Sequence, residues 1–101
     1  MTSAKAAPPL ADLVLAGVGQ TEAVAITDFI FMAKDVSNAY LVTTSDGDVL
    51  VNAGTVGGAE RTRGLFAPHR TGPLRRIILT QSHPDHFGGV AALREPETIV
   101  V

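Results

Sequence analysis

An apolar run that leads into a histidine-containing loop constrains the fold of this chain more than any other feature. Residues 74–80 begin charged and become continuously apolar, which is typical of a buried strand in a sheet covered by helices. After the polar stretch 81–86, Gly88 and Gly89 open a short helix over 90–93. The order of strand, loop and helix predicts an α/β (α+β) fold with a mixed sheet and flanking helices.

The part before this run predicts strands joined by tight turns. Residues 24–32 are rich in β-branched and aromatic side chains, which favours a single strand. Residues 35–38 then turn the chain. The alternation over 39–44, a turn at 45–48 and the apolar residues 49–51 predict a β-hairpin.

A glycine-containing loop follows the hairpin and leads into a helix. Glycines at 54, 57 and 58 indicate the loop, and a polar helix is expected near 59–66, ended by Pro68 or Pro73. Near the C-terminus, Pro96 stops the helix over 90–93 and residues 98–101 begin another strand. Because that strand stops with the sequence, we expect the domain to be partial.

We divide the chain into a tail and lead-in segment, residues 1–20, and a partial domain, residues 21–101. Residues 1–9 are small, polar and proline-containing, which indicates a loosely held tail. Residues 10–17 superficially resemble a signal peptide, but Asp12 interrupts the short apolar stretch and prolines precede it. No segment approaches the roughly 20 apolar residues that span a bilayer.

The composition excludes several classes of partner and ligand. The formal net charge of -2 gives no electrostatic footprint for nucleic acid or for an anionic membrane. The absence of cysteine excludes disulfides and thiolate ligands, so imidazole, carboxylate, carbonyl or water must hold any metal. A cysteine-free sequence also fits a cytoplasmic location.

The loop after the apolar run carries the candidate chemistry. In an extended loop Gln81 and His83 point to the same side, and Pro84 stiffens the backbone so that Asp85 and His86 turn back toward them. Imidazole and carboxylate suit zinc, manganese or iron. The alternative is a solvated polar loop whose histidines cap the next helix.

The whole stretch 79–89 resembles the signature of a known family. It reads Leu-Thr-Gln-Ser-His-Pro-Asp-His-Phe-Gly-Gly, which is similar to Thr-His-x-His-x-Asp-His-x-Gly-Gly of the metallo-β-lactamase superfamily. Only Gln81 departs from that signature, and the resemblance extends from about Val24 to the end of the chain. It implies the N-terminal half of an αβ/βα sandwich whose C-terminal half is absent.

The resemblance also implies roles for individual residues. His83 would bind a first metal, and Asp85 and His86 a second, with Asp85 as the catalytic residue that orients the metal-activated water. Gln81 replaces the usual histidine, so it is either a ligand or a hydrogen-bonding neighbour, and the zinc count is one or two. Asn52 stands where the family commonly has a buried aspartate that supports the metal loop.

The implied activity is metal-dependent hydrolysis of a small ester-like substrate, with nucleic acid and membrane excluded as partners. Residues 37–41, 51–54, 79–81 and 94–96 most resemble proteins related to alkylsulfatases, which points to alkyl sulfate esters. We expect the chain to be inactive alone and to require the missing half or self-association. The alternative is a non-catalytic metal-binding or regulatory module with a degenerate fold.

Other polar and aromatic residues have structural interpretations. His69 is expected at a helix end, near the carboxyl end of the helix dipole. Phe29, Phe31 and Tyr40 are expected in the core or an interface. A local concentration of arginines could bind phosphate, but a solvated helix face is favoured because aromatic interleaving is absent; it comprises Arg61, Arg63, Arg70, Arg75 and Arg76.

Overall fold

The computed structural model describes residues 17–101 of the chain. The tail and the rejected signal peptide fall almost wholly within residues 1–16, outside the described residues. The division between residues 20 and 21 therefore stays a prediction. None of the helices among the described residues combines the length and the apolar character that a transmembrane span requires.

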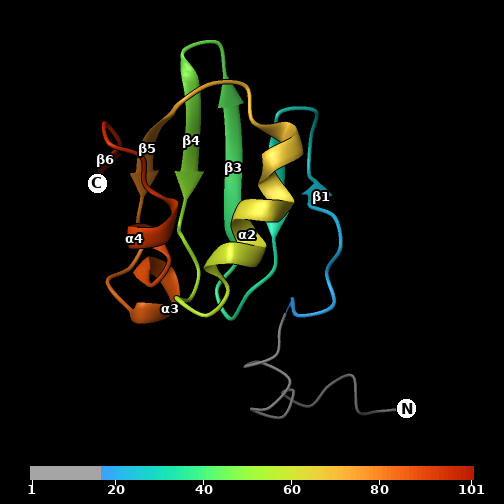
Figure 1. Ribbon diagram of the computed structural model, residues 1–101, viewed down its shortest axis with the longest axis vertical. Coiled ribbons are helices and arrows are strands. Elements are labelled where there is room, and N and C mark those ends of the chain that lie inside the picture. Colours follow the sequence, from blue (N-terminus) through green and yellow to red (C-terminus); the bar gives the residue numbers. More distant parts are fainter. Residues whose placement is uncertain (1–16) are drawn as a thin grey trace.

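The described residues form a mixed sheet with helices beside it, as the sequence predicts (Figure 1). The 6 strands lie in the order β1-β2-β3-β4-β5-β6, antiparallel from β1 to β4 and parallel from β4 to β6. The strands are β1 (Val24–Ala25), β2 (Ile30–Ala33), β3 (Ala39–Thr44), β4 (Gly47–Val51), β5 (Leu74–Ile78) and β6 (Ile99–Val100). The helical segments are α2 (Ala59–Phe66), the 3₁₀ turn η2 (Ala67–His69), α3 (Pro84–Phe87) and α4 (Val90–Leu93).

The hairpin of β3 and β4, the helix at 59–66 and the short helix at 90–93 are confirmed. The single strand expected over 24–32 is wrong, because β1 and β2 are separate antiparallel strands. The Thr27 hydroxyl accepts a hydrogen bond from Phe29 N at 3.2 Å. The Ile30 carbonyl also accepts one from Ile26 N at 2.8 Å. This local turn overrides the β propensity of the run.

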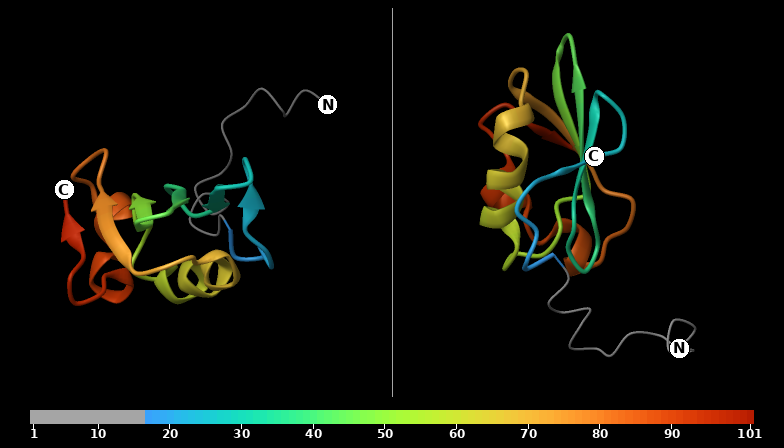
Figure 2. Two further views of the ribbon diagram at one scale, coloured as in Figure 1. Left: turned by 90° about the horizontal axis from the view of Figure 1, so that it is seen from above. Right: turned by 90° about the vertical axis from the view of Figure 1, so that its right-hand side faces the viewer.

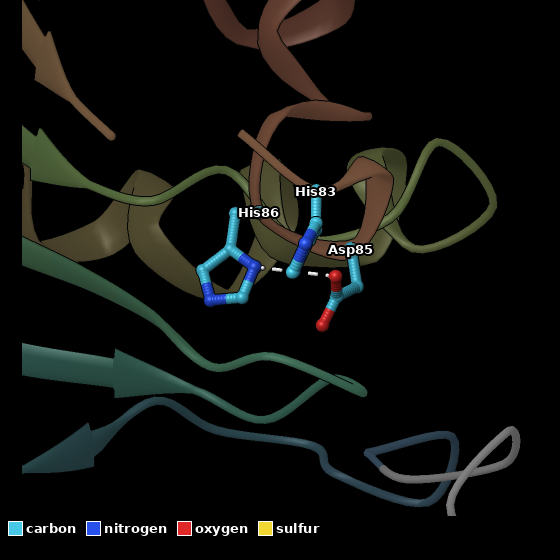
Figure 3. Close-up of side chains that lie close together, drawn as sticks. All are labelled: His83, Asp85 and His86. Carbon is cyan, nitrogen blue, oxygen red and sulfur yellow. Dashed lines mark hydrogen bonds and ion pairs between the residues drawn. The ribbon is translucent and has the colours of Figure 1, made fainter. Parts of the chain in front are cut away.

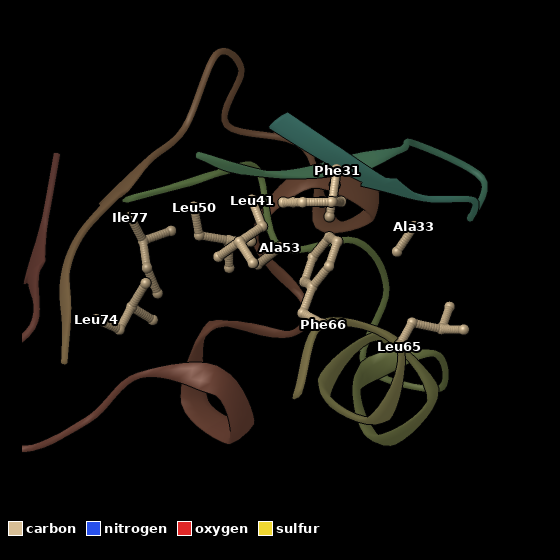
Figure 4. Close-up of a cluster of buried hydrophobic side chains, with 10 residues drawn as sticks. Phe31, Ala33, Leu41, Leu50, Ala53, Leu65, Phe66, Leu74 and Ile77 are labelled. Atoms are coloured by element: carbon tan, nitrogen blue, oxygen red, sulfur yellow. The ribbon is translucent and has the colours of Figure 1, made fainter. Parts of the chain in front are cut away.

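One face of the sheet packs against the helices and forms the core (Figures 2 and 4). The inward-facing side chains of β3 and β5 are buried, and among them Leu41 and Ile77 are almost completely so. Helix α2 contributes Leu65 and Phe66 to this face. Each large apolar side chain buried here stabilises the fold by about 1.5–3 kcal/mol. The cluster comprises Phe31, Ala33, Ala39, Leu41, Leu50, Ala53, Leu65, Phe66, Leu74 and Ile77.

The opposite face of the sheet, here called the open face, has no helix over it among the described residues (Figure 2). Strand pairing places its side chains in one layer, since Tyr40 lies opposite Val51 and Val51 lies beside Ile78. Ile78 is 39% exposed, so the apolar run over 74–80 is covered on one face only in the described part of the chain. The open face comprises Ile30, Met32, Tyr40, Val42, Val49, Val51, Arg76 and Ile78.

A partly buried ionic network connects distant parts of the chain near the start of β4. The carboxylate of Asp48, which is 0% exposed, accepts hydrogen bonds from Arg70 Nε at 2.5 Å and Thr71 Oγ1 at 2.7 Å. Arg70 also pairs with Glu95 at 3.1 Å. Burial raises the pKa of Asp48, but the hydrogen bonds from Thr71 and Arg70 outweigh it and leave that pKa lowered. The hydrogen bond from the Leu74 amide, together with Arg70, lowers the pKa of Glu95.

Two other arginines of the basic group, Arg63 and Arg75, also form contacts within the protein. Arg63 forms an ion pair with Glu60 at 2.6 Å, and Arg75 Nε donates to the Asp46 carbonyl at 2.8 Å. These contacts favour the structural interpretation of the basic residues over a phosphate site. His69 ends η2 as expected, and its ring stacks on Phe31 with centroids 4.0 Å apart.

Candidate metal centre

The candidate site lies at the sheet edge where the parallel strands β4 and β5 end (Figure 1). The loop after β4, residues 52–58, and the loop after β5, residues 79–83, leave the sheet side by side. Asn52 N donates to the Ile78 carbonyl at 2.8 Å, which keeps the starts of the two loops together. A site at the carboxyl ends of strands takes rigidity from the sheet while remaining open to ligand.

Three potential ligands gather at this edge (Figure 3). One ligand atom from each of His83, Asp85 and His86 lies within 4.8 Å of the others. His83 precedes α3, and the His86 amide donates to the His83 carbonyl at 2.9 Å. This turn of helix places residues three apart on one side, which brings the two imidazoles together. The ring centroids of His83 and His86 are 6.3 Å apart.

The donor set fits a divalent metal ion. Two imidazoles and a carboxylate are a common ligand combination for zinc and similar ions. His83 is exposed, whereas Asp85 and His86 are partly buried, so the group is accessible from one side. Asp85 Oδ1 lies 3.2 Å from His86 Nδ1. When His86 Nδ1 carries the proton it donates to Asp85, which leaves Nε2 available to a metal.

The helix-capping alternative receives no support from the geometry. His83 occupies the N-cap position of α3, yet its side chain makes no capping hydrogen bond. The fourth predicted ligand, Gln81, lies in the exposed stretch before His83. The structure therefore brings His83, Asp85 and His86 together, and the role of Gln81 stays a prediction.

Asn52 supports the beginning of the metal loop. Thr80 N donates to Asn52 Oδ1 at 3.0 Å, and Asn52 Nδ2 donates to Thr80 Oγ1 at 3.0 Å. Asn52 has φ 62°, a left-handed conformation that asparagine adopts more readily than most residues. The amide thus provides hydrogen bonds at the position where the resemblance implies an aspartate.

The glycine pair lets the loop after β4 approach α3 closely. Ala53 N donates to the His86 carbonyl at 2.7 Å, and Gly89 N donates to the Gly54 carbonyl at 3.2 Å. A Cβ added at Gly89 would collide with the Ala53 carbonyl oxygen. The segment that carries His86 is therefore held against the loop after β4 by backbone contacts that no larger residue at 89 would allow.

Sequence reasoning did not identify two residues that support this assembly. The sequence places Asp35 in a turn and Thr55 in the glycine-containing loop and indicates no further role for either residue. The Asp35 carboxylate in fact accepts hydrogen bonds from Thr55, which lies 20 positions further along the chain. No local periodicity signals a contact between residues so far apart.

Comparisons with known proteins agree with this fold and site. A family profile described as "Metallo-beta-lactamase superfamily" matches residues 32–101. No curated protein shows a significant match to the chain. Among solved structures, a metallo-β-lactamase with an HARLDQ motif from Cronobacter sakazakii superposes with a TM-score of 0.68 at 23% identity, over 86% of this chain and 32% of that chain.

Two further structures show the range of proteins that share this fold. The inverting sec-alkylsulfatase Pisa1 from Pseudomonas sp. gives a TM-score of 0.68 at 21% identity, over 78% of this chain and 14% of that chain. The metallo-β-lactamase MIM-1 from Novosphingobium pentaromativorans gives 0.66 at 23% identity, over 77% and 30%. The chain thus spans a third or less of the length of these solved proteins.

Proposed function

The chain belongs to the metallo-beta-lactamase superfamily, and from that premise we propose that it supplies the metal-binding part of a metal-dependent hydrolase of ester-like bonds. One observation carries the proposal: His83, Asp85 and His86 present ligand atoms within 4.8 Å of one another at an open sheet edge. Sites at such edges commonly bind ligands in α/β folds. Superfamily members are hydrolases, and this fold is shared with an alkylsulfatase.

We assign His83, Asp85 and His86 as ligands and Gln81 as a weaker ligand or a hydrogen-bonding neighbour. Zinc fits these donors best, as one ion or two, and manganese or iron suit them as well. When bound, such an ion would lower the pKa of its water toward about 7 and so would supply a nucleophile at neutral pH. Asp85 would orient the attacking water through its carboxylate, and its Oδ1, 3.2 Å from His86 Nδ1, would hold the His86 ring when Nδ1 carries the proton.

The finer substrate proposal is a sulfate ester of an alkyl chain. It is supported by the segments that resemble alkylsulfatase-related proteins and by the fold shared with Pisa1. Fold likeness alone does not choose a substrate. Comparing hydrolysis of an alkyl sulfate with that of a carboxylate ester of the same chain length tests this choice directly.

We also propose that the open face packs against further protein in the active enzyme. Its side chains are largely apolar and only partly buried, and exposed apolar patches of this kind mark interaction surfaces. Either further sequence of a longer protein or a second copy of this chain would cover the open face. In this proposal the small ester-like substrate is the remaining partner, nucleic acid and membrane are not partners, and the location is cytoplasmic.

Zinc titration of the chain and its variants tests the ligand assignment. Isothermal titration calorimetry on His83→Ala and His86→Ala is expected to show affinity reduced by at least about 100-fold, because each change removes a ligand. His69→Ala is the matched control, since His69 stacks on Phe31 away from the cluster. Equal affinity in all variants would refute the assignment. Tight binding without hydrolysis in the assembled protein would favour the non-catalytic metal-binding module instead.

A further inference from the structure

We propose that Asp35 is a positioning residue of the metal centre: its buried carboxylate fixes the loop after β4, which in turn fixes the backbone of His86. The inference rests on the proposed metal-binding function. Asp35 lies between β2 and β3, far along the sequence from the histidines, and it touches none of the ligand atoms in the contacts described below.

The Asp35 side chain is only 7% exposed, and hydrogen-bond donors surround it. Its Oδ1 accepts from Val36 N at 2.7 Å. Its Oδ2 accepts from Thr55 N at 3.0 Å and from Thr55 Oγ1 at 3.0 Å. A buried carboxylate is costly unless its oxygens are hydrogen-bonded. The contacts with Thr55 therefore stabilise the loop after β4 in this conformation.

The loop is shaped around this carboxylate. The Thr55 hydroxyl donates to Asp35 and accepts from Gly58 N at 3.1 Å, so it links the carboxylate to the start of α2. A Cβ at Gly54 would lie 2.6 Å from Asp35 Oδ2, and one at Gly58 would also collide with that oxygen. Gly54 has φ 69°, which other residues rarely adopt. Gly54 and Gly58 thus occupy the two positions where the Asp35 carboxylate lies close to the backbone.

The same loop holds the segment that carries His86. Ala53, two residues before Thr55, donates from its amide to the His86 carbonyl at 2.7 Å. Gly54, next to Thr55, accepts from Gly89 N at 3.2 Å. These contacts fix the backbone at His86 and at Gly89, three residues later, whereas Asn52 and Thr80 fix the beginning of the metal loop. Asp35 thus controls one end of the site and Asn52 the other.

Asp35→Asn tests the proposal because it preserves volume and changes only the hydrogen-bonding chemistry. Each Asp35 oxygen accepts from a backbone amide, Oδ1 from Val36 N and Oδ2 from Thr55 N, so the Asn amide nitrogen loses one of these hydrogen bonds in either orientation. We expect zinc affinity to fall by about 10–100-fold, as for other residues that orient metal ligands. Thr55→Val removes the hydroxyl and should lower zinc affinity by less than Asp35→Asn does. Thr55→Ser keeps a hydroxyl and should bind zinc about as tightly as wild type. Asp46→Asn, in the exposed β3–β4 turn, is the matched control.

Hydrogen exchange of the metal-free chain separates this inference from the metal-binding proposal. The Ala53 and Gly89 amides should exchange at least about tenfold faster in Asp35→Asn while amides of β3 keep their protection, because the loop opens locally. If wild type binds no zinc but exchange accelerates as expected, the proposed function fails and the positioning contact stands. If zinc affinity and exchange both match wild type in Asp35→Asn, or in Thr55→Val should the first variant not fold, the inference is overturned.

Discussion

Removing the charge of Asp48 provides a demanding test of how the sheet is held together. Asp48→Asn keeps the side-chain volume but breaks the ion pair with Arg70, whose Nε lies 2.5 Å from the carboxylate. Losing one partner of a buried pair costs about 3–5 kcal/mol. Arg70 keeps Glu95 at 3.1 Å and its side chain is 29% exposed, so we expect a smaller loss of stability than that range, about 2–3 kcal/mol. Urea unfolding followed by circular dichroism measures this at pH 7.

The same variant has a characteristic pH dependence. Because the folded-state pKa of Asp48 is lowered, its stabilising contribution is present above the ordinary aspartate range and is lost as pH falls through the lowered pKa. The stability difference between wild type and Asp48→Asn should therefore be full at pH 7 and shrink in acid. Asp46→Asn is the control, expected within about 0.5 kcal/mol of wild type. A difference for Asp48→Asn below that limit, or one independent of pH, would refute the reasoning.

Two further predictions concern Gly89, which follows α3, and the open face. Gly89→Ala should destabilise the chain by about 1–3 kcal/mol because its Cβ meets the Ala53 carbonyl, whereas Gly57→Ala, with nothing within 4 Å, should be nearly neutral in urea unfolding. Equal effects of the two changes would contradict the packing described for the metal loop. Ile78→Glu on the open face should reduce self-association in sedimentation velocity with little loss of stability, since Ile78 is 39% exposed. Unchanged association of Ile78→Glu would show that the open face is not the contact surface.

Local features of this fold could be predicted from the sequence, and features that depend on distant contacts could not. The hairpin and the helix at 59–66 follow from alternation, turn residues and glycines, all of which act between near neighbours. The prediction of a single strand over 24–32 was wrong because the Thr27 hydroxyl and the Ile30 carbonyl accept hydrogen bonds that form a turn inside this run. The burial of β5 on the open face depends on whether a second layer covers the sheet, which the residues of β5 alone do not determine.

The same distinction applies to the candidate site. His83, Asp85 and His86 could be grouped from their spacing in a predicted loop, although the structure brings them together through the helical turn α3, which the sequence did not predict. The contact between Asp35 and Thr55 joins two loops that are adjacent only after the sheet has formed. Sequence patterns therefore locate the ligands, and the structure is needed to find the residues that hold them in place.

Anomalous diffraction at the zinc absorption edge, on crystals of the chain grown with zinc, tests the central claim most directly. The account predicts a peak bound by His83, Asp85 and His86, with Zn–N distances of about 2.0–2.1 Å and a Zn–O distance of about 2.0–2.2 Å. A zinc peak elsewhere, for example at His69, with these three side chains unliganded would contradict it.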